Sequence, residues 1–448
     1  MKKTRISILS LGAFLVLTAC ANSAPNSSNK NGGEPVGSSN NNPTTSETVT
    51  VNGITLLDPE DTSMLTENCK AYIDDIRDSI GANVDPYKYH EISLNIEDSS
   101  KGYLDTGDVN GQNRTVSGKI PDRSDKSMGV DLEFEVEDGV DETYKVLVSD
   151  NANFTNAKEI ETTDNYVNVN NLFVNTEYYW KVVAGDKESA VAKFETGDYP
   201  RWITCRSLTG EEDGRGIYNV RDLGGYMTES GKRVKQGLVY RGGEITTMTS
   251  SGHYNTITQV AKKAFREDMG MVGGVELDLR GTSDIGDNYK ACGFAEDGDI
   301  QYVMHAIKSY EQTFTNTRSE VAPIFEILKE ADTKPVYFHC FGGADRTGTI
   351  GFLLNGLLGV SYEDLVIDFE LTSYSSINNE HIRNHLDGHQ HQYDRWPALI
   401  NQIKTDTTGG YAWDDNALLM DNIENFLVKA CSVPQSTIDT IRDIMLED

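Results

Sequence analysis

Residues 335–349 read Pro-Val-Tyr-Phe-His-Cys-Phe-Gly-Gly-Ala-Asp-Arg-Thr-Gly-Thr, and this stretch decides the fold of the C-terminal half of the chain. An apolar run, typical of a buried strand, ends at Cys340; glycines follow, and a helical pattern begins near Arg346. Five residues separate Cys340 from Arg346, a spacing that suits a loop wrapped around one phosphate group. Backbone N–H groups and the positive end of the helix would hold the phosphate oxygens, and the guanidinium of Arg346 would bind two of them. The same positive surroundings favour the thiolate form of Cys340, which attacks phosphorus.

The stretch resembles the signature loop of cysteine-dependent protein tyrosine phosphatases. It is most similar to the bacterial tyrosine/lipid phosphatase branch, whose loop reads His-Cys-x-x-Gly-x-Asp-Arg-Thr-Gly. Residues 216–226, 237–243, 358–371 and 423–446 also resemble that branch, so the resemblance covers about 215–446. It implies an α/β domain with a central, mostly parallel sheet flanked by helices, and hydrolysis through a phosphocysteine without metal or cofactor. The alternative is that Cys340 is a small buried strand residue and the glycines form an ordinary turn.

Each step of phosphate-ester hydrolysis can be assigned to residues of the stretch. Cys340 would attack in line, and Arg346 and the loop N–H groups would hold the phosphoryl oxygens. The Thr347 hydroxyl could donate to the thiolate, or it could bond to the unpaired backbone groups at the start of the helix. His339 would hydrogen-bond loop carbonyls. The residues expected around the phosphate are Phe341, Gly342, Gly343, Ala344, Asp345 and Arg346.

Arg221, Asp222 and Arg241 lie in the two pieces that precede this stretch in the resemblance. They could buttress the phosphate loop or bind substrate, or they could form an ordinary ion-pair network, since perturbed charges serve both purposes.

The general acid is the least defined part of the expected site. Residues 394–398 read Asp-Arg-Trp-Pro-Ala, which is similar to the acid loop of related phosphatases but lacks the aspartate after proline and follows the phosphate loop. The better candidate is Asp345, because an acid at this position is thought to donate the proton in myotubularin-like and bacterial lipid-phosphatase loops. The alternative is a salt bridge from Asp345 that only orients Arg346, and Asp278 is the second candidate acid. Ala344 stands where the branch usually has lysine, which favours phosphotyrosine or a simple phosphomonoester over polyphosphorylated inositol lipids.

Four histidines cluster between residues 381 and 391. His381, His385 and His389 would share one face of a helix, which is a plausible arrangement for a transition metal. Gly388 interrupts that helix and the surroundings are very polar. A solvated helix or a lid is therefore favoured, and we expect no metal.

The first 48 residues predict export. Residues 1–20 combine a basic start, a short apolar run and Leu-Thr-Ala-Cys, which resembles the bacterial lipobox. Lipidation of Cys20 would anchor the protein to the outer face of the cell membrane through its N-terminus alone; a plain signal peptide or an N-terminal anchor is the alternative. Residues 21–48, rich in Asn, Ser and Gly, are expected to form a disordered tether.

Two further segments precede the catalytic domain, which we place at residues 199–448. Residues 49–87 predict a short helical segment, with a helix from about Asp61 to Ile80 capped by Asp61 or Thr62. Residues 88–198 alternate with period two between turn-rich pieces, which predicts an all-β immunoglobulin-like sandwich. Residues 172–183 resemble a fibronectin type III domain around its tyrosine corner. This module would serve as a spacer or bind a cell-surface ligand.

Composition limits the class of partner. The chain has 448 residues and a formal net charge of −30, which argues against nucleic acid. The sequence therefore predicts an exported, lipid-anchored phosphatase that acts on a phosphotyrosyl protein or a small phosphomonoester. A phosphoinositide or small-molecule phosphatase is one alternative, and a surface binding protein with a relic phosphatase domain is another.

Overall fold

The computed structural model describes residues 49–80, 127–137, 140, 143–205, 216–245, 257–285, 294, 298–372, 375 and 395–447. These residues belong to one compact unit, Glu47–Asp448. The predicted leader with Cys20, the tether and the His381–His391 cluster lie outside the described residues. Within the described ranges, no helix combines the length and the apolar character needed to span a membrane.

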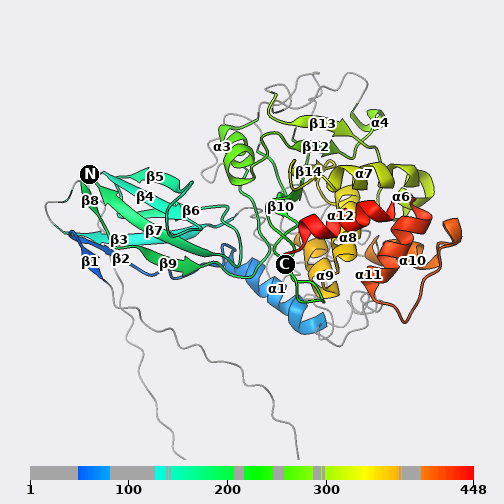
Figure 1. Cartoon of the computed structure of the whole chain (residues 1–448), viewed down its shortest axis with the longest axis horizontal. Helices are drawn as coiled ribbons and strands as arrows, with labels where there is room; N and C mark the ends of the chain where they lie inside the picture. The colour runs from blue at the N-terminus through cyan, green and yellow to red at the C-terminus, as the bar shows by residue number, and fades with distance from the viewer. Residues whose placement is uncertain are drawn as a thin grey trace, which may run out of the picture. The chain divides into compact units, whose positions relative to one another are not determined.

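Two antiparallel sheets form the N-terminal part of this unit (Figure 1). The first has the order β1 (Thr50–Val51), β2 (Ile54–Leu56), β3 (Val130–Val136), β6 (Tyr166–Val169). The second has the order β5 (Lys158–Thr162), β4 (Tyr144–Ser149), β7 (Glu177–Ala184), β8 (Lys187–Glu188), with β9 (Ala192–Glu195) also paired to β7. Burial alternates along β3 and β7, and the inward side chains of both sheets share one hydrophobic cluster that includes Leu132, Val146 and Trp180.

The segment before these sheets differs from the prediction. Helix α1 spans Glu67–Ile80, so it begins six residues later than expected. Its first turn is capped by Thr66, whose hydroxyl accepts from the Cys69 amide at 3.3 Å, while the Asp61 carboxylate accepts from the Ser63 amide in a preceding turn. The apolar residues of β2 pair with β3, so this stretch extends a sheet and is not part of a separate helical segment.

The mostly parallel sheet predicted for the C-terminal part is present. Its order is β10 (Arg221–Asp222), β11 (Val239–Gly242), β14 (Val336–His339), β12 (Val275–Asp278), β13 (Gln301–Met304). β11, β14, β12 and β13 run parallel, and only β10 is antiparallel to its neighbour. Their carboxyl ends therefore meet at one edge, which is where ligands bind in open α/β sheets.

Helices cover both faces of this sheet (Figure 1). The helices are α3 (Gln259–Lys263), α4 (Thr282–Ile285), α6 (Glu311–Asn316), α7 (Val321–Leu328), α8 (Asp345–Leu358), α9 (Tyr362–Leu371), α10 (Arg395–Thr405), α11 (Leu419–Asn425) and α12 (Gln435–Met445). Because side chains alternate along a strand, Val336 and Phe338 pack into a cluster with the helices α7 to α12, whereas Tyr337 packs with α3 on the other face.

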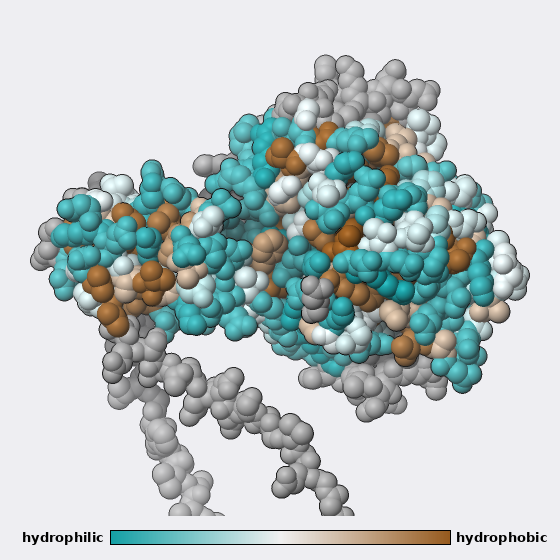
Figure 2. All heavy atoms as spheres, in the orientation of Figure 1, coloured by the Kyte–Doolittle hydropathy of each residue, from teal (hydrophilic) through white to brown (hydrophobic). Residues whose placement is uncertain are grey.

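A glycine and a serine separate α8 from α9. Gly359 adopts φ 81°, the left-handed conformation that ends α8, and the Ser361 hydroxyl accepts from the Asp364 amide at 3.1 Å to begin α9. Figure 2 shows a mostly hydrophilic surface on the viewed face, with hydrophobic residues in small groups.

Candidate active site

The predicted loop lies at the carboxyl edge of the central sheet. Strand β14 ends at His339, Cys340 follows with only 5% of its surface exposed, and α8 begins at Asp345. Ala344 occupies the N-cap position and supplies no side-chain acceptor to the first turn of α8. The first amides of the helix are thus left to bind an anion.

Gly343 fits the loop because it has no side chain. It adopts φ +67°, and a Cβ there would lie 2.3 Å from the backbone carbon of Gly242. The neighbouring strand holds the loop from the same side, since the Glu244 amide donates to the Phe341 carbonyl at 2.9 Å. The loop is therefore packed directly against the backbone that follows β11.

Donors from outside the loop bind its carbonyls. The side-chain nitrogen Nδ2 of Asn219 donates to the carbonyls of Gly342 at 2.9 Å and Gly343 at 3.2 Å. Arg241 Nη2 donates to the Gly343 carbonyl at 2.7 Å. With these carbonyls turned toward buried donors, the N–H groups of the loop are free to face the phosphate position.

Asp368, on α9, joins the two arginines behind the loop. Arg221 donates from Nε to its carboxylate at 3.2 Å and from Nη2 to its carbonyl at 3.0 Å, and Arg241 Nη1 donates to the other carboxylate oxygen. Arg221 also donates to the Asn219 side chain. Burial lowers the pKa of Arg221 to about 10, although the charge of Asp368 opposes this shift. These contacts combine two of the three roles left open from sequence, a buttress of the loop and a buried ion-pair network.

Asp222 lies elsewhere. Its carboxylate accepts from Arg201 Nη1 at 2.7 Å and from the amides of Gly224 and Gly237, both at 2.8 Å. These contacts fix the turn between β10 and β11 and do not involve the phosphate loop.

His339 is buried beneath Cys340. Its Nδ1 lies 3.0 Å from the Cys340 carbonyl, and its Nε2 lies 3.0 Å from Glu276 Oε1. Burial alone would lower the pKa of His339, but the nearby carboxylates of Asp278 and Glu276 outweigh it, so the pKa is raised. The imidazole thus links the Cys340 backbone to strand β12.

Asp278 is held by a second buried arginine. It accepts from the Arg280 amide and Nε at 2.9 Å, from Nη2 at 2.8 Å, and from the Tyr302 hydroxyl at 3.0 Å. Burial would raise the pKa of Asp278, yet the charge of His339 and these hydrogen bonds lower it. A fully buried carboxylate with a lowered pKa is a poor proton donor.

Arg346 forms its ion pair with a residue that the sequence reasoning missed. Asp284, in the short helix α4, accepts from Nη1 at 2.8 Å and from Nη2 at 3.3 Å. Burial would raise the pKa of Asp284, but the Gly281 amide and Arg346 lower it. Both side chains are partly exposed, at 15% and 22%.

Asp345 accepts a hydrogen bond from the Tyr310 hydroxyl at 2.7 Å. Tyr310 has φ 50° and ψ −128°, an uncommon conformation for a non-glycine residue, and its amide donates to the Thr349 hydroxyl at 3.0 Å.

Thr347 is fully buried, and its hydroxyl has no hydrogen-bond partner among the described residues. Phe341 is 43% exposed, and the guanidinium carbons of Arg280 and Arg346 lie 5.1 and 5.9 Å from its ring centre.

Four residues of this site escaped the sequence reasoning: Asn219, Asp284, Tyr310 and Asp368. No local pattern singles out any of them; Asp368 itself is one of four acids in α9, and Glu370 in the same helix is also buried. In the described part of the chain, no group of three or more His, Cys, Asp or Glu residues could hold a metal ion.

Comparison with known proteins assigns the sequence to a family. The model of the tyrosine phosphatase family matches residues 213–447, which is more than half of the chain. A search of curated proteins found no match. Among solved structures, the chain is similar to the core catalytic domain of the PP-IP phosphatase SIW14 from S. cerevisiae in complex with citrate, at 13% identity, 38% coverage of this chain, 90% coverage of that chain and a TM-score of 0.23. On the strength of the family match, this chain belongs to the tyrosine phosphatase family.

Proposed function

We propose that the chain hydrolyses phosphomonoesters through a phosphocysteine intermediate. The observation that carries the proposal is the loop from Cys340 to Arg346, which joins the carboxyl end of β14 to the N-terminus of α8. Its carbonyls are turned toward Asn219 and Arg241, so its amides and the α8 dipole are available for an anion.

The reaction follows from that arrangement in two steps. The Cys340 thiolate attacks phosphorus, a sulfur–phosphorus bond forms, and the bond from phosphorus to the leaving oxygen breaks. Arg346 and the loop amides hold the equatorial oxygens throughout. Water then attacks the phosphocysteine, which releases inorganic phosphate and the thiolate. The Thr347 hydroxyl, buried and without a partner in the described structure, is the proposed donor to the departing thiolate.

Asp345 is the proposed general acid. It lies in the first turn of α8 beside Arg346, and Tyr310 donates to one of its oxygens at 2.7 Å, which orients the carboxyl group. Asp278, the second candidate, is engaged by Arg280 and Tyr302 and is fully buried. The proton therefore passes from Asp345 to the leaving oxygen in the first step.

The nucleophile is tested with p-nitrophenyl phosphate. Cys340→Ser should lose all measurable turnover, because a serine hydroxyl in the same loop is a far weaker nucleophile than the thiolate. Cys431→Ser is the matched control, since Cys431 is also buried but lies beyond α11, where burial raises the pKa of its thiol to about 12. Equal activity of Cys340→Ser and the unmodified chain would overturn the mechanism.

The acid is tested by varying the leaving group. Phenol leaves far less readily than p-nitrophenol without protonation, so Asp345→Asn should lower kcat for phenyl phosphate by about 10²-fold and kcat for p-nitrophenyl phosphate much less. Asp278→Asn should lower both to the same extent, because that change acts through the fold. An equal loss on both substrates with Asp345→Asn would remove Asp345 from the role.

Phosphotyrosyl protein or a small phosphomonoester is the proposed substrate. Ala344 gives the loop no second cation for a polyphosphorylated ligand, while the exposed Phe341 ring offers an aromatic surface beside Cys340. Turnover of phosphotyrosyl peptides should exceed turnover of phosphoinositides and sugar phosphates. The reverse order would favour the phosphoinositide or small-molecule alternative.

The proposal includes export and an anchor. The lipobox-like end of residues 1–20 supports acylation of Cys20, and the antiparallel sheets before the catalytic part support an immunoglobulin-like spacer. Within those sheets the Phe173 amide donates to the Tyr178 hydroxyl at 2.9 Å, a backbone–tyrosine hydrogen bond typical of a tyrosine corner. Metabolic labelling with a radioactive fatty acid should mark the chain, and Cys20→Ser should abolish the label and release the protein from membranes.

A further inference from the structure

The segment that follows β13 leaves the central sheet at the same edge as the phosphate loop. β13 pairs with β12 and β12 pairs with β14, all in parallel, and the register places Met304, Asp278 and His339 in one row. The residue after Met304 is therefore level with Cys340, the residue after His339. Residues 305–310, which we call the β13–α6 segment, run from this edge to the start of α6.

Hydrogen bonds hold both ends of the β13–α6 segment close to the phosphate loop. Near its start, the Ile307 amide donates to the Leu279 carbonyl at 3.1 Å. At its end, the Tyr310 hydroxyl donates to Asp345 at 2.7 Å and the Tyr310 amide donates to the Thr349 hydroxyl at 3.0 Å. The uncommon backbone conformation of Tyr310 is the kind that folds retain mainly at functional sites. The segment is thus anchored to the first turns of α8.

Lys308 lies between these two anchors and is exposed to solvent. Its amide donates to the Thr317 hydroxyl at 3.0 Å, and its carbonyl accepts from the Thr313 hydroxyl at 2.5 Å, so its backbone is fixed on both sides. Its ammonium forms no ion pair with any residue that the structure describes. A cation on a fixed backbone without an internal partner is available to a ligand.

Asp284 connects Lys308 with the phosphate loop. The Gly281 amide donates to the Asp284 carboxylate at 2.9 Å, and a Cβ at Gly281 would lie 3.0 Å from the Cβ of Ala306, so the β13–α6 segment touches the turn that carries Asp284. Burial would raise the pKa of Asp284, but the Gly281 amide and Arg346 lower it. The charge of Lys308 lowers the same pKa further, so its ammonium lies within electrostatic range of the Asp284–Arg346 pair.

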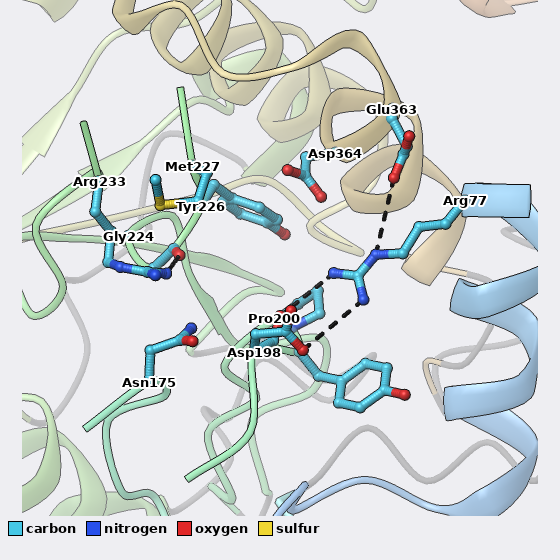
Figure 3. Close-up of a pocket in the computed structure, with 12 residues that line it drawn as sticks. Arg77, Asn175, Asp198, Pro200, Gly224, Tyr226, Met227, Arg233, Glu363 and Asp364 are labelled. Carbon is cyan, nitrogen blue, oxygen red and sulfur yellow. Dashed lines mark hydrogen bonds and ion pairs between the residues drawn. The ribbon is translucent and has the colours of Figure 1, made fainter. Parts of the chain in front are cut away.

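Two other arginines are poor candidates for a second contact with the substrate. Arg280 is 1% exposed, and Asp278 accepts from its guanidinium. Arg77 lies in a separate pocket of about 300 Å³, and none of residues 340–346 lines that pocket. Figure 3 shows the guanidinium of Arg77 reaching toward two carboxylates from different parts of the chain. Lys308 differs from both arginines because it is exposed and outside the ion pairs of the described chain.

We propose that Lys308 binds a second negative charge of the substrate, a carboxylate or a further phosphate close to the phosphoester. The inference rests on the proposed phosphomonoesterase activity and narrows its substrates. Ala344 leaves the loop itself without a second cation, and the β13–α6 segment supplies one from the facing side. With a net charge of −30, the chain as a whole repels anionic substrates, so a local cation beside Arg346 has a strong effect on which of them bind. The exposed Phe341 ring favours a phosphotyrosyl peptide with acidic neighbours as the source of both charges.

Two pairs of substrates test the proposal on the full chain. The first pair is a phosphotyrosyl peptide with aspartate on both sides of the phosphotyrosine and the same peptide with alanine there. The second pair is glucose 1,6-bisphosphate and glucose 6-phosphate. At low ionic strength, the ratio of kcat/KM within the peptide pair should favour the acidic peptide by about threefold, and about 0.5 M NaCl should bring that ratio close to one by screening. A preference within the sugar pair alone would support the contact and identify a second phosphate as its partner.

Variants assign the preference to one side chain. Lys308→Gln should bring the ratio close to one, and Lys308→Arg should keep it. Lys334→Gln is the matched control, because it removes the same charge from an exposed lysine that precedes β14, at the opposite edge of the sheet, and it should leave the ratio unchanged.

Three results would overturn the inference: no preference within either pair, a ratio that Lys308→Gln leaves intact, or a ratio that Lys334→Gln lowers as much. In each of these cases p-nitrophenyl phosphate would still be hydrolysed, and the proposed function would stand. Absence of p-nitrophenyl phosphate turnover by the unmodified chain would overturn the proposed function and this inference together.

Discussion

Replacing Asp368 with asparagine should destabilise the catalytic part strongly. The side chains of Asp368, Arg221 and Arg241 are 8%, 0% and 1% exposed, so one buried carboxylate contacts two guanidiniums that water does not reach. Removing one partner of a buried ion pair costs about 3–5 kcal/mol, because it leaves an uncompensated charge. The amide oxygen of the substituted side chain would still accept one hydrogen bond, so we expect a loss near the lower end, about 3 kcal/mol, in the free energy of unfolding.

Urea denaturation at pH 7 measures this loss. Asp443→Asn makes the same chemical change on the exposed face of α12 and should shift the free energy of unfolding by less than about 0.5 kcal/mol. Combining Asp368→Asn with Arg241→Met removes a cation together with its anion, so the double variant should be more stable than the sum of the single losses by at least about 1 kcal/mol. A loss below about 1 kcal/mol for Asp368→Asn alone would refute the reasoning.

Three further predictions follow from the site. Because the pKa of His339 is raised in the folded protein, the histidine contributes its full stabilisation below pH 6.5, the usual pKa, and loses it as pH rises through the raised pKa. His339→Gln should therefore flatten the fall of the urea midpoint with rising pH. An unchanged pH profile would contradict this prediction. Asp284→Ala should misplace Arg346 and so lower kcat/KM for p-nitrophenyl phosphate by about 10²-fold. The free energy of unfolding should change by less than about 1 kcal/mol, because this ion pair is partly exposed. Unchanged kinetics would exclude a positioning role for Asp284. Gly343→Ala should abolish activity, because the added Cβ would lie 2.3 Å from neighbouring backbone. The control Gly231→Ala, at φ +80° with open space around it, should leave activity unchanged. An active Gly343→Ala variant would refute the packing argument.

Local patterns predicted much of the fold. The strand before Cys340 and the helix that begins near Arg346 were both predicted from residues adjacent in sequence. The start of α1 was placed too early because Asp61 carries a capping side chain that the structure uses in a separate turn. The pairing of β2 with β3 was missed for another reason: strand pairing between segments so far apart in sequence leaves no local signal.

The candidate site likewise has one part that neighbouring residues predicted and another part that they did not. Cys340, Asp345 and Arg346 lie within seven consecutive residues, so their spacing alone defined a loop of the size of one phosphate group. The partners of that loop come from far along the chain: Asn219 lies 123 residues from Gly342 in sequence.

Sequence by itself therefore predicted the loop and the chemistry that we propose for it, because a strand, a turn and a helix start are set by neighbouring residues. Only the tertiary structure decided that Asp368 joins Arg221 to Arg241 and that Asp284 holds Arg346. The physical reason is that charges meet across a core only after the sheet and helices have packed, and no periodicity along the chain records which distant charge will be brought within reach.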